Sequence, residues 1–569
     1  MRYNDVWRIR VLWVGMLIIV IGFVGRLYWL QIIEHDTYTR QADRQYASSG
    51  ADEFNRGSIF FSDKEGKLIS AASLASGFLL SINPSLIVDP KSAYEELSKI
   101  ISGIDKTEFL TKAGKKSDTY EEIAHKLNTI QAAAVRKLNA KWTILSKEQW
   151  RFYSGSRLAS HVLGLVGYQG DLLAGRYGLE RYYNDVLSRD GDNPYTNLFV
   201  QIFSATKDAL QQKSLEGDII STIEPQVQAT LETELAKIES AWHPDIAGGI
   251  VINPQNGEIY AMGVLPNFDP NTFSQEKNSK VFSNPMVEDV YEMGSIIKPI
   301  TLSIGLDRKV VTPETTYYDA GFLELNGYKI SNFDGKSRGT VGIQEILNQS
   351  LNTGAVFVER KVGNTIFADY LRKFGIGEET GIDLPSETHG LIENLKSPRD
   401  IEYATASFGQ GIAMTPIATV RALSVLANGG WLVTPHIVKS VQYAPGVSHR
   451  VAPEDRTRVL QAGTSEAISK MLITVYDNAL ANGTVKIKNY SIAAKTGTAQ
   501  IANPAGGGYY KDRYLHSFFG YLPGYEAKFL VFFYIVYPKD VQYASETLTH
   551  PFVNMAKFLI NYYQIPPDR

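Results

Sequence analysis

The sequence contains no cysteine, which excludes disulfide bonds and thiolate metal sites in this chain of 569 residues. Its nine histidines form no H-E-x-x-H motif or comparable ligand spacing, so nothing in the sequence points to a metal enzyme. A net charge of -3 without a long basic run gives no argument for a nucleic-acid partner. Apolar residues make up 44% and charged residues 21%, which is ordinary for globular protein, and the length allows several domains.

A long apolar run opens the chain. The stretch "VLWVGMLIIVIGFVG", Val11–Gly25, has fifteen residues, fewer than the ~20 that a membrane-spanning helix needs. Arg26 can extend the segment to Ile33 by placing its charge at the membrane interface, where the aromatic pair Tyr28-Trp29 is typical. The sequence therefore predicts a transmembrane anchor over residues 11–33.

Charge sets the predicted orientation of this anchor. Arg2, Arg8 and Arg10 precede the run, which by the positive-inside rule places residues 1–10 in the cytoplasm. The alternative is a cleaved signal peptide, but no small-x-small cleavage site follows the run directly. An uncleaved anchor would hold the protein in the inner (cytoplasmic) membrane of the cell. Everything after Ile33 would then lie outside the cytoplasm.

From residue 34 to 216 short strand-like and helical patterns alternate. The stretches "GFLLSI" (77–82) and "SLIV" (85–88) predict strands. The apolar spacing of residues 92–104 and 120–140 predicts helices.

After Gly217 the pattern changes to that of an α+β domain. A strand (218–223) and a helix (224–242) precede "AGGIVINPQNGEIYAMGVLP" (247–266), where Asn256-Gly257 predicts a hairpin with a type I′ turn. Residues 491–500, 516–524 and 528–538 form a second strand cluster, and mostly helical patterns such as 341–362 and 417–428 lie between the clusters. We therefore predict one antiparallel sheet, closed by N- and C-terminal strands and covered by helices. The stretch "NPAGGGYYKD" (503–512) predicts a mobile loop that could gate the neighbouring cleft.

The stretch "YEMGSIIKPITL" contains a first candidate site. Ser295 and Lys298 are three residues apart, so on a helix they share a face, as a nucleophile and its base would. The same spacing occurs at Ser204/Lys207 and Ser274/Lys277, and a capping serine beside a solvated lysine is the alternative interpretation.

Two further short stretches complete a pattern. Ser350 and Asn352 lie in "NQSLNTG" on a helix or helix edge, where they could also be capping residues. "AAKTGTAQ" places Lys495, Thr496, Gly497 and Thr498 in a strand, where the glycine could also mark a bulge. In the order Ser-x-x-Lys, Ser-x-Asn, Lys-Thr-Gly, the three stretches form the signature set of active-serine penicillin-recognising enzymes.

With these motifs the chain resembles the class B penicillin-binding proteins, the monofunctional transpeptidases of bacterial cell-wall synthesis. "RGSIFFSDKEGKLIS", "RFYSGSRLASHVLGLVGYQG" and "GLERYYNDVL" are similar to motifs of that family's N-terminal pedestal, and "LPNFDPNTF", "FGIGEETGIDLPSETHG" and "SFGQGIAMTPIATVRALSVLANGG" to its transpeptidase domain. Met293 stands where proline is common, and the second motif reads Ser-Leu-Asn where Ser-Ser-Asn is frequent. The resemblance implies a pedestal or dimerisation-type domain of the α/β kind over residues 34–216 and a transpeptidase domain over 217–569.

The resemblance also implies the chemistry. Ser295 would attack a D-alanyl-D-alanine peptide, with Lys298 as a neutral base whose pKa is lowered by burial and by Lys495. Ser350 would relay the proton to the leaving D-alanine, and Asn352 would orient the substrate. In the third motif, Lys495 and Thr496 would bind the donor carboxylate and Gly497 would let the substrate lie along the strand. The backbone N–H groups of Ser295 and Thr498 would form the oxyanion hole.

Several functions share this constellation. The Glu-x-x-Leu-Asn motif of a class A β-lactamase is absent from this sequence, and a D,D-carboxypeptidase usually has no such pedestal. A catalytically silent scaffold would be expected to have damaged motifs, whereas all three are intact here. A bifunctional class A synthase would have a glycosyltransferase domain before the transpeptidase domain, where this sequence resembles the pedestal. Within class B, the compact length and the run from "GIDLPSETHG" to "SFGQGIAMTP" favour the septal, FtsI-type branch over the elongation type. The resemblance implies no cofactor. It implies stem peptides as donor and amine acceptor, β-lactams as covalent inhibitors, and a SEDS glycosyltransferase (FtsW in division) with other divisome proteins as partners.

Overall fold

The computed structural model describes residues 54–170, 172–189, 216–443, 447–450 and 456–569. The chain forms two compact units: the first includes Ser76–Gln149, and the second includes Arg56–Ala75, Trp150–Asp190 and Phe199–Arg569. These units do not follow the domain boundary expected at residue 217, which stays a prediction. The predicted anchor (11–33) lies outside the described residues, among which no helix is long and apolar enough to cross a membrane.

The first unit packs three helices against strands. Its elements are β2 (Leu68–Ile82), which begins in the second unit, α3 (Pro90–Ser98), α4 (Lys106–Ala113), β3 (Glu121–Leu127), α5 (Thr129–Lys137) and β4 (Thr143–Tyr153), which ends in the second unit. Leu80, Leu97, Phe109 and Val135 are buried together in its core. The strand predicted over residues 77–82 is confirmed as part of β2, and the helix predicted from residue 92 corresponds to α3, which ends earlier than expected.

Two predictions in this unit are wrong. Residues 85–88 form no strand, because Asn83 caps a 3-10 turn, Pro84–Leu86, by accepting a hydrogen bond from the Ser85 N–H. The helix predicted from residue 120 starts only at Thr129, where Asn128 and Gln131 form a capping box. Residues before it form β3, because they pair with β2 instead of completing a helical face.

β2 belongs to a seven-stranded sheet of order β16-β15-β7-β1-β2-β3, in which β4 also pairs with β2. The strands of this sheet not yet named are β1 (Ile59–Ser62), β7 (Gly217–Ser221), β15 (Val438–Tyr443) and β16 (Val447–Arg450). Beside it lies a buried charge cluster, in which Arg56 Nε is 2.5 Å and Arg151 Nε is 2.6 Å from opposite oxygens of Glu180. Since Glu180 is fully buried, the two guanidinium groups compensate a carboxylate that burial would otherwise make unfavourable.

The predicted antiparallel sheet is confirmed. Five strands lie in the order β18-β19-β20-β8-β9: β8 (Ile246–Ile252), β9 (Ile259–Leu265), β18 (Ala493–Ala502), β19 (Tyr509–Leu522) and β20 (Phe529–Val536). The β20–β8 ladder joins the N- and C-terminal strand clusters, with Val531 opposite Val251. The prediction of a two-residue type I′ turn is wrong, because β8 and β9 are joined by a longer connection. In this connection Gly257 has positive φ but Asn256 does not.

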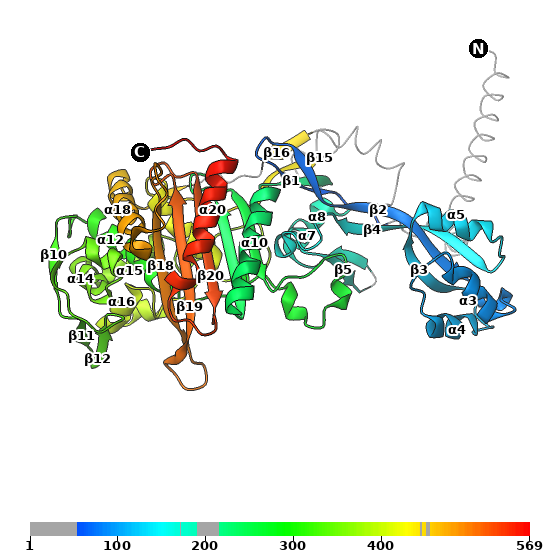
Figure 1. Cartoon of the computed structure of the whole chain (residues 1–569), viewed down its shortest axis with the longest axis horizontal. Helices are drawn as coiled ribbons and strands as arrows, with labels where there is room; N and C mark the ends of the chain where they lie inside the picture. The colour runs from blue at the N-terminus through cyan, green and yellow to red at the C-terminus, as the bar shows by residue number, and fades with distance from the viewer. Residues whose placement is uncertain (1–53, 171, 190–215, 444–446, 451–455) are drawn as a thin grey trace, which may run out of the picture. The chain divides into compact units, whose positions relative to one another are not determined.

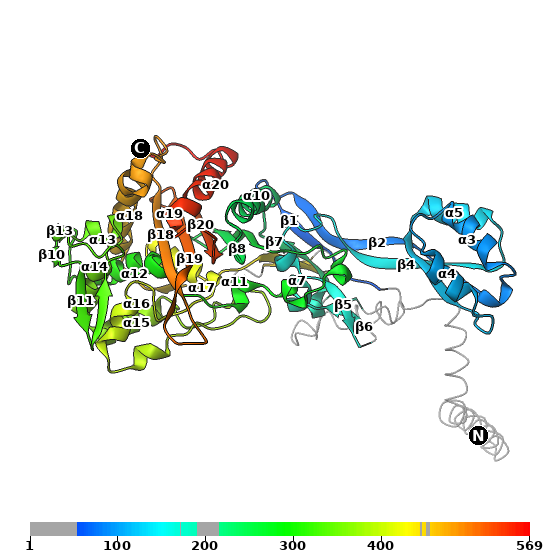
Figure 2. The ribbon, with the colours of Figure 1, turned by 60° about the horizontal axis from the view of Figure 1, so that its bottom comes forward.

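Helices cover both faces of this sheet (Figure 1). On one face lie α10 (Pro225–Trp242) and α20 (Thr549–Tyr562), which are neighbours in Figure 2 as well. On the other face are α12 (Lys298–Asp307), α17 (Pro416–Ala427) and α18 (Ala462–Thr474). Consecutive residues of β19 alternate between the two faces: Phe518 packs with the α10 and α20 side chains, whereas Phe519 packs with those of α12 and α17.

The remaining elements surround this sandwich. The helix predicted over residues 341–362 is broken into α13 (Gln344–Asn348) and α14 (Asn352–Val362), a difference that matters for the site. The other helices and strands of the second unit are β5 (Val166–Gln169), β6 (Leu172–Gly175), α6 (Ser160–Leu163), α7 (Gly178–Tyr182), α8 (Asn184–Leu187), α11 (Pro285–Glu288), β10 (Thr316–Asp319), β11 (Phe322–Leu325), β12 (Tyr328–Ser331), β13 (Gly339–Gly342), α15 (Asn364–Lys373), α16 (Asp400–Ala406), β14 (Trp431–Leu432), β17 (Thr457–Arg458) and α19 (Ala544–Thr547).

Candidate active site

The first motif opens a helix, as predicted. Ser295 lies on a 3-10 turn, Gly294–Ile297, that runs directly into α12, and Lys298 is the first residue of that helix. The Lys298 Nζ donates a hydrogen bond of 2.9 Å to the Ser295 Oγ. Gly294 has φ +65, and a Cβ at this position would lie 2.8 Å from the Thr498 carbonyl oxygen. Glycine is therefore required where the serine segment touches the strand of the third motif.

Lys298 is in an unusual environment for a lysine. Its side chain is fully buried, and this burial, followed by the charge of Lys495, holds its pKa well below the ordinary value of 10.5. Its Nζ lies within hydrogen-bond distance of three oxygens, those of the Ser295 hydroxyl and of the Ser350 carbonyl and hydroxyl, and none of them is a carboxylate. The surroundings therefore favour the neutral amine, which can accept a proton.

The second motif occupies the break between α13 and α14. Ser350 has φ +55, a left-handed conformation that is uncommon for a residue with a side chain. In this conformation its carbonyl oxygen lies 2.6 Å and its hydroxyl 3.1 Å from the Lys298 Nζ. Asn352 is the first residue of α14, and its side-chain amide donates to the Ser331 carbonyl at 2.8 Å.

The third motif lies on β18, which among the described strands has a neighbour on one side only, β19. The Lys495 Nζ donates to the Ser350 Oγ at 3.3 Å and to the Thr496 carbonyl at 2.9 Å. Burial lowers the pKa of Lys495 to about 8. The Thr498 Oγ1 accepts a hydrogen bond from the Ala544 N–H at 3.1 Å.

Gly497 has a second reason to be glycine. A Cβ here would collide with the Ser517 hydroxyl and would lie 2.8 Å from the Met293 carbonyl oxygen. That carbonyl already accepts a hydrogen bond of 2.8 Å from Ser517. The missing side chain thus lets β18 lie directly against the segment that carries Ser295.

The structure therefore joins Ser295, Lys298, Ser350 and Lys495 in one hydrogen-bonded group. The other Ser-x-x-Lys pair in the described residues is different, because both Ser274 and Lys277 are exposed. A buried neutral amine between two hydroxyls, with the Lys495 cation beside them, can activate a serine for acyl transfer without a histidine. In the part of the chain that the structure describes, no cluster of acidic and histidine side chains could hold a metal ion.

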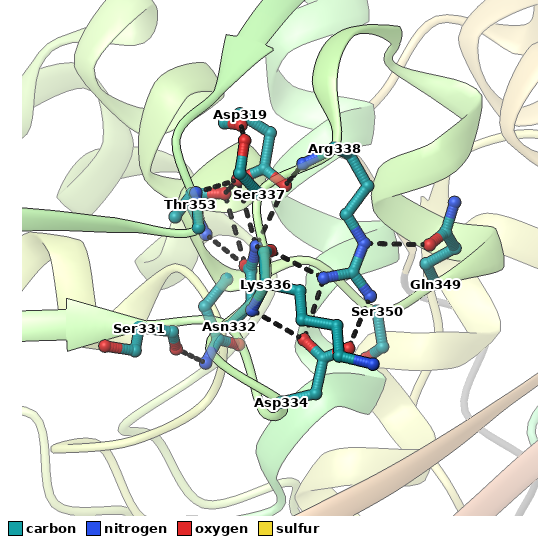
Figure 3. A network of polar contacts seen from close by, with 12 residues as sticks. Asp319, Ser331, Asn332, Asp334, Lys336, Ser337, Arg338, Gln349, Ser350 and Thr353 are labelled. Carbon is teal, nitrogen blue, oxygen red and sulfur yellow. Dashed lines mark hydrogen bonds and ion pairs between the residues drawn. The ribbon is translucent and has the colours of Figure 1, made fainter.

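Sequence reasoning missed two sets of contacts around this group. Tyr509 donates a hydrogen bond to Glu292, at 2.9 Å from Oε2, and so connects the start of β19 to the residues before Ser295. A polar network around Asp319 and Arg338 supports the residues on either side of Ser350 (Figure 3). The partners of Asp319 lie up to 34 residues away in the chain, so no local motif could have revealed the network.

Comparisons with known proteins identify the family of the chain. The chain matches the family described as "Penicillin binding protein transpeptidase domain" over residues 247–556 and the "Penicillin-binding Protein dimerisation domain" over residues 52–201. It is 28% identical over 566 residues to stage V sporulation protein D of Bacillus subtilis, covering 97% of this chain and 85% of that protein. It is 24% identical over 568 residues to the peptidoglycan D,D-transpeptidase FtsI of Escherichia coli, covering 96% and 90%.

Solved structures show the same fold. Penicillin binding protein 3 of Mycobacterium tuberculosis, in complex with aztreonam, has a TM-score of 0.69 and 21% identity, covering 91% of this chain and 98% of that one. Penicillin binding protein 2X of Streptococcus thermophilus has a TM-score of 0.71 and 19% identity, covering 90% and 80%. The chain belongs to the class B penicillin-binding proteins and is a serine-type peptidoglycan D,D-transpeptidase.

Proposed function

We propose that Ser295 is the nucleophile of this transpeptidase and that Lys298, as a neutral amine, is its base. The observation that carries this proposal is the 2.9 Å hydrogen bond between a buried lysine and the serine hydroxyl. The Ser295 proton passes to the Lys298 Nζ while the Ser295 Oγ forms an ester with the carbonyl carbon of the penultimate D-alanine. The bond to the terminal D-alanine breaks in the same step.

Ser350 is the proton relay to the leaving group. Its hydroxyl lies 3.1 Å from the Lys298 Nζ and 3.3 Å from the Lys495 Nζ, and a hydroxyl both accepts and donates. The proton taken up by Lys298 can therefore pass through Ser350 to the amine of the departing D-alanine. A second stem peptide's amine then attacks the ester, an amide cross-link forms, and the proton returns to the Ser295 oxygen.

The third motif binds the donor peptide. Lys495 supplies positive charge and Thr496 a hydroxyl for the donor carboxylate, and Asn352 orients the peptide backbone. The peptide would add to the free edge of β18 along Gly497 and Thr498. The N–H groups of Ser295 and Thr498 would form the oxyanion hole, where one donor is typically worth ~3–4 kcal/mol. The close approach of Gly294 to the Thr498 carbonyl supports this pairing.

We assign the enzyme to septal cell-wall synthesis, with the run at residues 11–33 as its membrane anchor and a SEDS glycosyltransferase as its partner. Relatives named FtsI support the septal role, since matches to them cover nearly the full length of both chains. The elongation role is the second candidate, because peptidoglycan D,D-transpeptidase MrdA of Acinetobacter baumannii is 27% identical over 549 residues. Depletion of the protein in its own cells should block septation and give filaments, whereas rounded cells would favour the elongation role.

A covalent labelling experiment tests the proposed chemistry. The full-length chain in detergent is mixed with a fluorescent penicillin, and the adduct is followed with time for wild type, Ser295→Ala and Ser274→Ala. We expect a long-lived adduct on wild type and on Ser274→Ala, whose serine has the same spacing to a lysine but is exposed. Ser295→Ala should form none. Rapid release of opened β-lactam would indicate a hydrolase, and no adduct on folded protein would contradict the proposal.

A further inference from the structure

The residues on either side of Ser350 are held by a segment outside the three motifs (Figure 3). This segment, residues 319–338, connects β10 to β13. The Arg338 Nε donates to the Gln349 Oε1 at 3.0 Å, immediately before Ser350. On the other side, Thr353 donates from its Oγ1 to an Asp319 oxygen at 2.8 Å.

Asp319 is the centre of this network. Its side chain is fully buried. Its carboxylate accepts hydrogen bonds from the N–H groups of Gly321 and Arg338, from the Asn332 amide at 2.9 and 3.0 Å, and from the Thr353 hydroxyl. A buried carboxylate is tolerated only when its oxygens are satisfied, and a fully satisfied network is rigid. Asp319 therefore fixes Thr353 and Asn332 relative to each other.

Ser350 needs such support because of its backbone. A left-handed conformation at a residue with a side chain persists only where the surroundings impose it. This conformation places both the carbonyl and the hydroxyl of Ser350 within hydrogen-bond distance of Lys298. Anything that holds the neighbours of Ser350 therefore also sets the distances at the base.

We propose that Asp319 is a positioning residue for acylation, which acts through Thr353 and Asn332 to keep Ser350 and Asn352 in their reactive geometry. Asn332 takes part directly, because its Oδ1 accepts from the Thr353 N–H at 3.3 Å. The adjacent Ser331 carbonyl holds the Asn352 side chain. The inference rests on the proposed role of Ser350 as proton relay.

The first test is Asp319→Asn in the full-length chain. An amide in place of the carboxylate puts an N–H group against donors from Asn332, Thr353 or the backbone, so the network must rearrange. We expect the rate constant for acylation by a fluorescent penicillin to fall about 10–100-fold, since misplacement by about 1 Å costs that much. The dissociation constant of the non-covalent complex should change by a smaller factor than the acylation rate constant, because Asn352 is displaced but Lys495 and β18 are untouched.

Asp383→Asn is the matched control. Asp383 is also a buried carboxylate that accepts backbone hydrogen bonds, from the N–H groups of Ile437 and Val438 at 2.7 Å each, but it has no contact with the second motif. We expect this variant to lose stability, and so to lower the fraction of molecules that is labelled, without changing the acylation rate constant of that fraction. The rate constant thus separates positioning from a merely structural role.

Thr353 supplies a second test that does not depend on the folding of Asp319→Asn. Thr353→Val keeps the shape of the side chain but removes the donor to Asp319, and Thr353→Ser restores the donor. We expect slow acylation in the valine variant and rescue in the serine variant. Equal rate constants in wild type, Asp319→Asn and Thr353→Val would overturn this inference alone. Absence of labelling in wild type would overturn the proposed function itself.

Discussion

Removal of the buried cation at Lys495 should stabilise the protein at neutral pH and destabilise it in alkali. The side chain is only 3% exposed, and burial lowers its pKa from 10.5 to about 8. Since the pKa is lowered, the unfolded chain holds a proton between pH 8 and 10.5 that the folded chain has released. The unfolding free energy of wild type therefore rises with pH across this window.

The magnitude follows from this shift. A difference of 10.5 − 8, about 2.5 pKa units at about 1.4 kcal/mol each, makes the charged Lys495 unfavourable by about 3 kcal/mol below pH 8. Lys495→Met removes this cost but also loses the hydrogen bonds to Thr496 and Ser350, at about 1 kcal/mol each. We expect the variant to be about 1 kcal/mol more stable than wild type at pH 7 and about 2 kcal/mol less stable above pH 10.5.

Pulse proteolysis in urea gives the fraction of folded protein, from which this difference is obtained with the unfolding of the second unit treated as one transition. The unfolding free energy of wild type and Lys495→Met is compared at half-unit intervals from pH 7 to 10.5, so that the titrations of groups not coupled to Lys495 cancel. Lys361→Met is the control, because Lys361 is exposed and its replacement removes no buried charge. A pH-independent difference for Lys495→Met, or one that changes in the opposite direction, would refute the reasoning.

Three further predictions concern the base, the close packing of β18 and the buried charge cluster. Lys298→Met should slow acylation about 10²–10⁴-fold, as the loss of a general base does. The wild-type acylation rate constant should rise with pH to a plateau well below pH 10.5, because protonated Lys298 cannot accept the serine proton. Acylation rate constants measured from pH 5 to 10 check both predictions, and a flat wild-type profile would argue against a lysine base. Gly497→Ala should push β18 away from the Met293 carbonyl and abolish penicillin labelling. Gly463→Ala, where a Cβ meets nothing within 4 Å, should be labelled like wild type. Normal labelling of Gly497→Ala would show that activity does not need the close contact between β18 and the Met293 carbonyl. Glu180→Ala leaves Arg56 and Arg151 buried without their carboxylate and should lower the free energy of unfolding by about 3–5 kcal/mol, measured by thermal or urea unfolding. Glu393→Ala, which removes the exposed partner of Lys396, is the control. Equal stability of the two variants would contradict the role of the buried cluster.

Much of the second unit could be predicted from the sequence, because its signals are local and agree with one another. The apolar runs that form β8, β9 and β20 are short and bounded by turn residues, which favours strands over helices, and Pro225 marks the start of α10. The reacting groups could also be identified, since three short motifs carry them. The sequence predicts that these groups meet in space, and in the structure Lys298 is hydrogen-bonded to Ser295 and Ser350.

What could not be predicted depends on contacts between distant residues. Residues 121–127 have helical apolar spacing, but pairing with β2 makes them a strand. The left-handed Ser350 breaks a helix that the apolar pattern continues, and its support comes from Asp319, 31 positions earlier. The propensity of a segment contains no information about such partners.

The most direct test of the central claim is the fate of the acyl group. The full-length chain is incubated with a D-alanyl-D-alanine stem peptide and an amine acceptor peptide, and the products are separated by mass spectrometry. We predict a cross-linked product and release of one D-alanine from wild type, and neither from Ser295→Ala. Release of D-alanine with only the shortened, hydrolysed donor would contradict the account, because the enzyme would then transfer the acyl group to water instead of an amine.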